Sequence, residues 1–342
     1  MARDREQGLR VARAGAARFG LAEDSLRLIH DAPEGDGFVF EGTRGAEPTI
    51  LKVAVASEDL PARRAKAAFT EYLACGGAAV SPPYRSESGE LVEACQDGEV
   101  AFAMAAYRKA PGKPLDSNDP AQCTPEALAA WGRAAGRFHA LARSYAHGYR
   151  PCPAGQTAPA TDDGPIIDWR QELADFAAWP MDNLVRERWQ AVGEQLSALP
   201  QPREAFGLIH NDLHPYNMLW DGRTLTVIDF DVAAYHWFVS DLATGLYSHL
   251  TFRRETDERE RPAIAENLLR PLLAAYRQEH ALDADWLGQL PLFLHYRELL
   301  LYIVFVNTWG AELSPWQRSF LERQAERIAR QMPVVDADLS SL

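Results

Sequence analysis

The residues best suited to catalysis lie close together near the middle of the chain. An apolar run ends at Ile209, and the polar loop after it carries Asp212 and, five residues later, Asn217. Two short apolar stretches follow, separated by Asp221-Gly222-Arg223, which is typical of a tight turn. The second stretch ends at Asp229. This pattern predicts a β-hairpin in which Asn217, at the start of one strand, faces Asp229 at the end of the other.

The predicted hairpin would bring an amide oxygen and a carboxylate to one point. Mg²⁺ takes oxygen ligands in proteins and commonly bridges the phosphates of a substrate. We therefore predict that Asn217 and Asp229 are metal ligands for a magnesium-bound nucleotide. Asp212, on the loop before the hairpin, is left to receive a proton and is the predicted catalytic residue.

The amino-acid sequence of this segment resembles that of a known family. The order H-x-D-x-x-x-x-N followed by a strand-terminal Asp resembles the catalytic and metal-binding segments of the kinase-like fold. Three segments resemble the aminoglycoside phosphotransferase and choline kinase group, which phosphorylates small molecules. They are His210-Asn211-Asp212-Leu213-His214-Pro215-Tyr216-Asn217, Ile228-Asp229-Phe230-Asp231 and Ser240-Asp241-Leu242-Ala243. A protein kinase would carry Arg at position 211, Gly at position 231 and a downstream Ala-Pro-Glu, and this chain has none of them.

An upstream lysine extends the resemblance. Lys52 is the single cation in an apolar stretch that reads as a strand, and an inward lysine needs a partner because burying an unpaired charge is costly. In the kinase fold the lysine of the third strand pairs with a glutamate of the next helix and with nucleotide phosphates. The helix expected over residues 61–75 carries Glu71, so Lys52 and Glu71 are the predicted pair, and Glu58 is a less well placed candidate. The alternative is a lysine at a strand edge and a glutamate on a solvated helix face.

The resemblance also implies where the rest of the nucleotide binds. Gly35 and Gly37 lie in the connection where a kinase-like fold places a hairpin over the phosphates, although ordinary turn chemistry is an alternative. The family holds the adenine through backbone groups after the strand expected over residues 100–106. Ala105 and Tyr107 are therefore the predicted adenine contacts.

Several other polar residues are candidates for structural roles. The resemblance implies that His210 braces the catalytic loop. Asp241 most simply caps its own helix, and the resemblance implies that it also ties down the backbone of the catalytic loop. His139 lies next to the apolar stripe of a long helix and is expected to be a core histidine. For His214, a loop brace and a substrate contact both stay open, as does a direct metal role for Asp231.

Composition limits the classes of partner and location. The net charge of -13 argues against nucleic-acid and anionic membrane partners, since both need basic patches. Four scattered cysteines argue against a disulfide framework or structural zinc. The charged amino terminus lacks the core of a signal peptide, and the longest apolar run, residues 299–306, is far below the roughly 20 residues of a membrane helix. A cytoplasmic location is expected.

The expected fold is α+β, a bilobal protein-kinase-like fold with a small antiparallel β-sheet lobe and a larger, mainly helical lobe. Residues 1–106 would form the nucleotide-binding lobe, with a peripheral helix over residues 7–20. Residues 107–342 would carry the catalytic loop, the metal site and the acceptor pocket. The Pro-rich segment 147–165 reads as an irregular insertion, and a lid is one reading of it.

The function predicted from these residues is Mg-dependent transfer of the γ-phosphate of ATP or GTP to a hydroxyl of a small molecule. A catalytically silent, kinase-like nucleotide-binding or regulatory module and a protein kinase are the alternatives. The acceptor stays open among choline, homoserine, a hydroxylated amino acid, a sugar and an aminoglycoside. Aromatic residues and acids such as Glu172 suit a cation, whereas Arg297 suits a carboxylate. The sequence does not indicate an oligomeric state.

Overall fold

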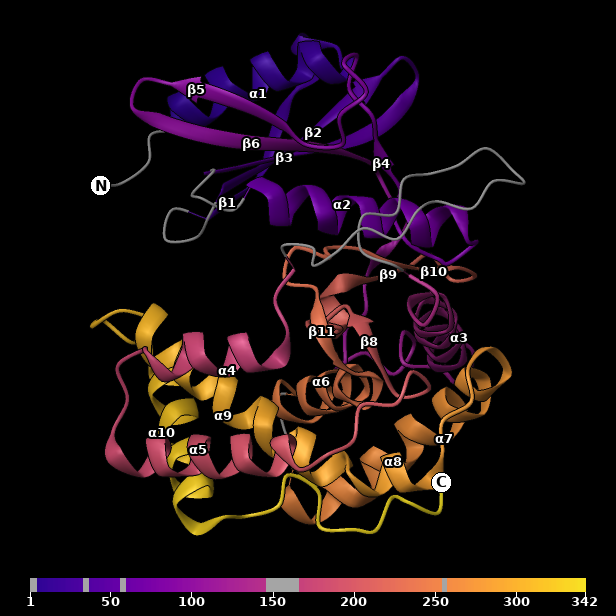
Figure 1. Ribbon diagram of the computed structural model, residues 1–342, viewed down its shortest axis with the longest axis vertical. Coiled ribbons are helices and arrows are strands. Elements are labelled where there is room, and N and C mark those ends of the chain that lie inside the picture. Colours follow the sequence, from indigo (N-terminus) through magenta and orange to yellow (C-terminus); the bar gives the residue numbers. More distant parts are fainter. Residues whose placement is uncertain (1–4, 33–36, 56–59, 146–165, 254–256) are drawn as a thin grey trace. The chain divides into compact units, whose positions relative to one another are not determined.

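A computed structural model describes residues 5–32, 37–55, 60–145, 166–253 and 257–342 (Figure 1). The chain divides into two compact units. The first, called the sheet unit, comprises Met1–Pro111, Tyr145–Ile166 and Thr226–Asp231, and the second, called the helical unit, comprises the remaining residues. The assignment of nucleotide and acceptor binding to residues 1–106 and 107–342 stays a prediction.

The sheet unit is built on one antiparallel sheet. Its strands are β1 (Arg27–Ala32), β2 (Gly37–Arg44), β3 (Glu47–Val55), β4 (Pro83–Tyr84), β5 (Glu93–Asp97) and β6 (Val100–Arg108). They follow the order β1-β2-β3-β6-β4, and β5 also pairs with β6. The register sets Lys52 in the middle of the sheet, opposite Val39 on β2 and Ala105 on β6.

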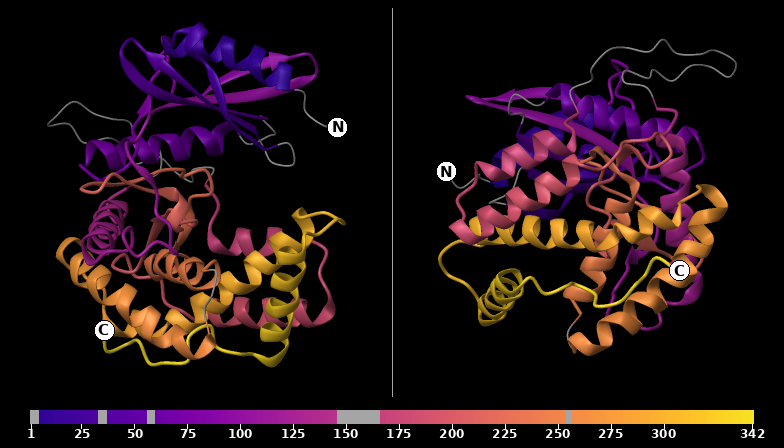
Figure 2. Two further views of the ribbon diagram at one scale, coloured as in Figure 1. Left: turned by 180° about the vertical axis from the view of Figure 1, so that it is seen from behind. Right: turned by 60° about the horizontal axis from the view of Figure 1, so that its bottom comes forward.

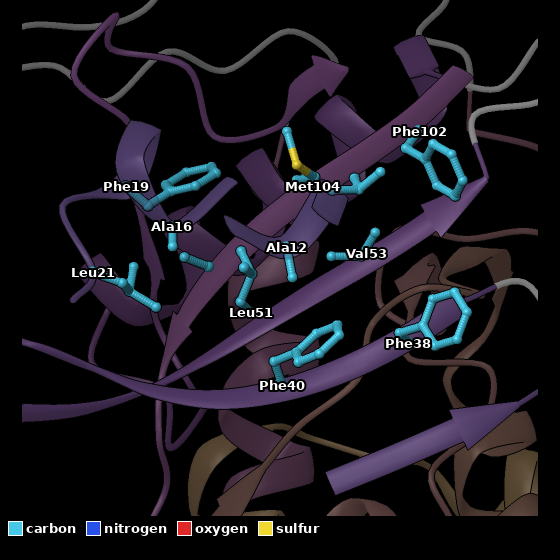
Figure 3. Close-up of a cluster of buried hydrophobic side chains, with 12 residues drawn as sticks. Ala12, Ala16, Phe19, Leu21, Phe38, Phe40, Leu51, Val53, Phe102 and Met104 are labelled. Atoms are coloured by element: carbon cyan, nitrogen blue, oxygen red, sulfur yellow. The ribbon is translucent and has the colours of Figure 1, made fainter. Parts of the chain in front are cut away.

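Two helices cover the two faces of this sheet, α1 (Arg5–Phe19) on one and α2 (Leu60–Cys75) on the other (Figure 1). Because side chains alternate along a strand, Leu51 and Val53 point to the α1 face and Lys52 between them points to the α2 face. Figure 3 shows the cluster on the α1 face, where residues of β2, β3 and β6 meet Ala12 and Ala16 of α1. The helix expected over residues 7–20 is therefore part of a core, and its expected peripheral place was wrong.

The helical unit holds most of the helices (Figure 2). They are α3 (Pro125–Ala142), α4 (Trp169–Ala177), α5 (Asn183–Ser197), α6 (Phe238–Thr251), α7 (Arg261–Glu279), α8 (Ala284–Gly288), α9 (Leu290–Thr308) and α10 (Pro315–Arg330). Thr124 caps α3, its Oγ1 accepting a hydrogen bond from Ala127 N at 3.3 Å. The expected α+β composition, strands first and helices after, is confirmed.

Two small strand pairings position the polar loop in the helical unit. Strand β8 (Phe206–Ile209) pairs with β11 (Ala234–Trp237), and β7 (Lys113–Pro114) pairs with β9 (Met218–Trp220). Strand β10 (Leu225–Val227) begins in this unit and follows β9 in the order β10-β9-β7. The hairpin expected around Asp221-Gly222-Arg223 is therefore confirmed.

Helix α9 is long and apolar enough to be considered as a membrane span by length and composition. Within the fold, 56% of its most apolar window is buried, and Arg297 and Glu298 are among its buried residues. Buried charged residues are expected in a helix that contributes side chains to a polar site inside the protein.

Helices α3 and α7 pack closely because α3 presents glycines to its neighbour. A Cβ at Gly136 would lie 2.6 Å from the carbonyl oxygen of Tyr276, and a Cβ at Gly132 would collide with the carbonyl oxygen of Leu272. These are backbone atoms, so a side-chain rotation cannot relieve the overlap.

Gly132→Ala is therefore expected to lower the free energy of unfolding by about 1–3 kcal/mol, as other overpacking substitutions do. The matched control is Gly193→Ala in α5, where a Cβ would meet only Leu173 Cδ1 at 3.4 Å. There the better helix propensity of alanine should raise stability by up to about 1 kcal/mol. Urea unfolding of both variants measures the difference, and stabilisation by both would contradict the packing argument.

Candidate active site

The loop that follows β8 is fastened by a buried carboxylate. Asp241, at the start of α6, is fully buried and accepts hydrogen bonds from the backbone N–H of His210 at 3.0 Å and of Asn211 at 2.8 Å. Its Oδ2 also lies 3.1 Å from Nε2 of His139, whose Nδ1 contacts the Tyr276 hydroxyl. The contact of Asp241 with the loop backbone and the core position of His139 agree with the expectations from sequence. The expected capping of α6 by Asp241 was wrong, because the helix begins at Phe238 after Trp237 and has no side-chain cap.

Asn211 gives the loop its sharp turn. Its φ of 67° lies in the left-handed region that only a few non-glycine residues adopt readily, Asn among them. The side chain holds this conformation, because Nδ2 donates to Glu172 Oε2 at 2.8 Å and to Oε1 at 3.1 Å. Glu172 is buried, and burial raises the pKa of its carboxyl group, whereas the hydrogen bond from Asn211 acts in the opposite direction. The sequence offered Glu172 only as a possible acid for a cationic acceptor.

Asp212 is held between a buried arginine and a histidine. The guanidinium Nη2 of Arg297 donates to Asp212 Oδ1, and His214 Nε2 lies 3.2 Å from Asp212 Oδ2. Burial favours the protonated acid, but the charge of Arg297 and the hydrogen bond from His214 outweigh it and lower the pKa of Asp212 well below its usual range. Arg297 is only 7% exposed, so its positive charge acts here with little screening by solvent.

The structure brings Asn217 to Asp212. A short 3₁₀ helix, Pro215–Asn217, turns the chain back, and Asn217 Nδ2 donates to the backbone oxygen of Asp212 at 3.0 Å. Because the amide nitrogen is engaged there, the amide oxygen is the atom of this side chain that remains for a cation. An amide oxygen is a suitable ligand for a hard cation such as Mg²⁺.

In the sheet unit, Lys52 joins two carboxylates that follow β10. Its Nζ donates to Asp229 Oδ1 at 2.7 Å and to Asp231 Oδ2 at 2.9 Å. Burial lowers the pKa of the ammonium group, but the negative charges of Asp231 and Asp229 outweigh burial and raise the pKa well above its ordinary value. Asp229 has a φ of 70°, in the left-handed region that few non-glycine residues adopt.

The expected pairing of Lys52 with Glu71 is not formed. Glu71 instead accepts two hydrogen bonds from Arg85, from Nε at 2.9 Å and from Nη2 at 2.5 Å. Glu71 lies on α2 as expected, but it does not line the pocket that contains Lys52, and its carboxylate is paired with Arg85, after β4. The acids that neutralise Lys52 come from residues 229–231, far away in the sequence.

A pocket in the sheet unit lies between the α2 face of the sheet and α2 itself. It is lined by Lys52, Ala54, Arg63, Lys66, Ala67, Thr70, Val92, Ala103, Met104, Ala105, Tyr107, Phe230 and Asp231. Three of the predicted nucleotide contacts, Lys52, Ala105 and Tyr107, are thus brought together.

Of the two predicted glycines, Gly37 does not line this pocket. Gly37 opens β2, and a Cβ there would collide with the Val53 carbonyl, so its role in the fold is close strand packing. Gly35 lies outside the described residues.

The predicted metal ligands are distributed over both units. Asn217 belongs to the helical unit and Asp229 to the sheet unit, so their convergence on one ion stays a prediction. No group of three or more His, Cys, Asp or Glu side chains suited to a metal occurs in the described part of the chain. The donor types nevertheless fit a hard cation, since each contributes an oxygen and the nucleotide phosphates would add more.

A second pocket, in the helical unit, opens beside Asp212 and has a cavity volume of about 570 Å³. Its lining combines the ion pair with polar and aromatic groups: Leu115, Asp116, Ser117, Asn118, Asp212, His214, Pro215, Tyr216, Ser248, Phe252, Arg297, Leu301, Phe305 and Trp316. Reasoning from sequence missed Phe252, Phe305 and Trp316. It also missed Arg297 as the partner of Asp212, although a charged pair inside the apolar run of α9 was a visible signal.

The chain is similar to known phosphotransferases over most of its length. The model described as the phosphotransferase enzyme family matches residues 26–282. An amicoumacin kinase of Bacillus subtilis (strain 168) is 29% identical over 335 residues, covering 96% of this chain and 94% of that protein. A solved structure of an amicoumacin kinase in complex with AMP-PNP, Ca²⁺ and Ami is 25% identical, with a TM-score of 0.82, and covers 96% of this chain and 95% of that one.

A microcompartment-associated aminopropanol kinase of known structure is 20% identical, with a TM-score of 0.67, and covers 94% of this chain and 98% of that one. At this identity the likeness concerns the fold. The kinase-like fold and the resemblance predicted from residues 210–217, 228–231 and 240–243 are confirmed by these similarities together.

A buried histidine next to the loop makes this part of the fold sensitive to acid. Nδ1 of His236, on β11, accepts a hydrogen bond from Trp237 N at 3.0 Å, and Nε2 is buried with no hydrogen-bond partner among the residues described. Burial lowers the pKa of His236 to about 3. The folded state thus binds a proton far more weakly than the unfolded state, whose histidine pKa is about 6.5.

Stability contributed by neutral His236 is complete above pH 6.5 and is lost as the pH falls toward 3. Between pH 8 and pH 5 this group alone should lower the free energy of unfolding by about 2 kcal/mol. Urea unfolding at several pH values should give a steeper dependence for the wild type than for His236→Asn, which cannot titrate there. Equal slopes for the two proteins would contradict this account.

Proposed function

We propose that this chain, which belongs to the phosphotransferase enzyme family, transfers the γ-phosphate of ATP to a hydroxyl group of a small molecule in a Mg²⁺-dependent reaction. It is a small-molecule kinase, with a nucleoside triphosphate and a divalent cation as cofactors. The observation that carries the finer proposal is Asp212, ion-paired with buried Arg297 at the wall of a large pocket. The AMP-PNP in the amicoumacin kinase structure favours ATP over GTP.

The pocket of the sheet unit is the proposed nucleotide site. Backbone groups of Ala105 and Tyr107 would hold the adenine, and Lys52 would contact the phosphates, whose negative charge its ammonium group offsets. The carboxylates of Asp229 and Asp231 keep that ammonium group charged and directed into the pocket before a nucleotide binds.

Asp229 and Asn217 would hold the magnesium ion. A bound Mg²⁺ offsets charge on the phosphates during transfer. Asp229 contributes a charged oxygen and Asn217 a neutral one, and the hydrogen bond from Asn217 Nδ2 to Asp212 fixes the orientation of the amide.

Asp212 is the proposed group that orients the acceptor hydroxyl and receives its proton. Its lowered pKa makes it a weak base in the ground state. That is sufficient, because in a loose transition state the hydroxyl becomes acidic only late, when bond formation to phosphorus is under way. Arg297 and His214 hold the carboxylate in place for this step.

The pocket beside Asp212 is the proposed acceptor site. Its size exceeds that needed for choline or homoserine and matches a drug-sized ligand. The aromatic side chains Phe252, Phe305 and Trp316 suit an acceptor with extensive apolar surface. Two relatives are named as amicoumacin kinases, so amicoumacin is the first acceptor to test.

Asp212→Asn is expected to reduce kcat by about 10²–10⁴-fold, the range typical of general acid–base catalysis, with little change in the KM for ATP. The measurement is phosphorylation of amicoumacin and of a panel of aminoglycosides and amino alcohols, followed by mass spectrometry with and without Mg²⁺. Asp336→Asn, the same substitution at an exposed position, is the control and should behave as the wild type. Nucleotide binding without transfer to any acceptor would instead favour a silent, kinase-like binding module.

A further inference from the structure

Helix α2 presents cations to the nucleotide pocket where a glutamate was expected. Its residues that line the pocket are Arg63, Lys66, Ala67 and Thr70, at the spacing of three and four residues that defines one face of a helix. Glu71 is not among the lining residues, and its carboxylate is engaged by Arg85. The pocket wall formed by α2 is therefore positive, with no acid of its own.

The lining of the pocket contains three cations, Lys52, Arg63 and Lys66, and one carboxylate, that of Asp231. Lys52 is paired with Asp229 and Asp231, and Lys66 Nζ donates to the backbone oxygen of Asp231 at 2.8 Å. Cationic side chains on the lining suit an anionic ligand.

Arg63 has a hydrogen-bond donor that is buried and unused. Its Nε is inaccessible to solvent and has no hydrogen-bond partner in the part of the chain that the structure describes. A buried donor without a partner costs free energy that a hydrogen-bonding ligand would recover. The planar guanidinium group matches the geometry of a phosphate better than an ammonium group does.

We propose that Arg63, with Lys66 beside it, binds the phosphate groups of the nucleotide, and that Glu71 takes no part in holding Lys52. This inference rests on the proposed function, because it takes the pocket of the sheet unit as the nucleotide site. Glu71 is instead paired with Arg85, in the segment after β4.

The test is calorimetric titration of the full-length protein with adenosine, ADP and ATP in the presence of Mg²⁺. In Arg63→Gln, the affinity for ATP and ADP should fall about 10- to 100-fold, the effect of losing hydrogen bonds to a charged group. The affinity for adenosine should be unchanged, because adenosine has no phosphate. Arg63→Lys should recover part of the loss.

The next residue along the helix provides a matched control. Arg64 is exposed, donates to the backbone oxygen of Val92 and pairs with Glu90, and it does not line the pocket. Arg64→Gln should bind all three ligands as the wild type does. Glu71→Gln should also keep the affinity for ATP.

Each other outcome has a definite meaning. Unchanged ATP affinity in Arg63→Gln overturns the inference and leaves the proposed function intact. An equal loss for adenosine and ATP also overturns it, since Arg63 would then support the pocket and not the phosphates. A loss in Glu71→Gln as large as in Arg63→Gln would restore the glutamate as the partner of Lys52. A wild-type protein that binds neither ADP nor ATP would overturn the proposed function as well.

Discussion

The buried carboxylate of Asp241 is the constraint on which the candidate site in the helical unit depends. A charge inside a protein is costly unless hydrogen bonds and opposite charges compensate it. Here two backbone N–H groups of the loop, His139 and the first turn of α6 provide that compensation. The backbone of residues 210 and 211 is thereby tied to the core, so the position of Asp212 is set by the interior of the unit and not by a surface loop.

The reactive acids are also held by cations before any ligand binds. Asp212 faces Arg297 within the helical unit, and Asp229 and Asp231 face Lys52 within the sheet unit. A carboxylate paired in this way keeps its charge and its orientation, which lowers the reorganisation needed when a substrate arrives. The same pairing explains how apolar elements such as β3 and α9 can carry charged residues inward without a large loss of stability.

Local features of the site could be predicted from sequence, whereas partners distant in the chain could not. The separation of Asp212 and Asn217 and the hairpin after them depend on near neighbours, and the structure contains both. The partner of Asp212 lies 85 residues away, in an apolar helix whose periodicity does not indicate its neighbours. Likewise, helical spacing placed Glu71 on α2 but could not reveal that Arg85 would reach it before Lys52.

The change of partner at Lys52 has a consequence for the charge of the whole nucleotide pocket. If a glutamate of α2 neutralised the lysine, that helix would add negative charge to a pocket that must accept polyphosphate. In this chain Asp229 and Asp231 already neutralise Lys52, so a third acid would make phosphate binding less favourable. Arg63 and Lys66 on α2 contribute cationic groups to the lining of this pocket, where a glutamate would contribute a negative charge. The cationic residues of α2 and the carboxylates of Asp229 and Asp231 are thus two parts of one electrostatic arrangement.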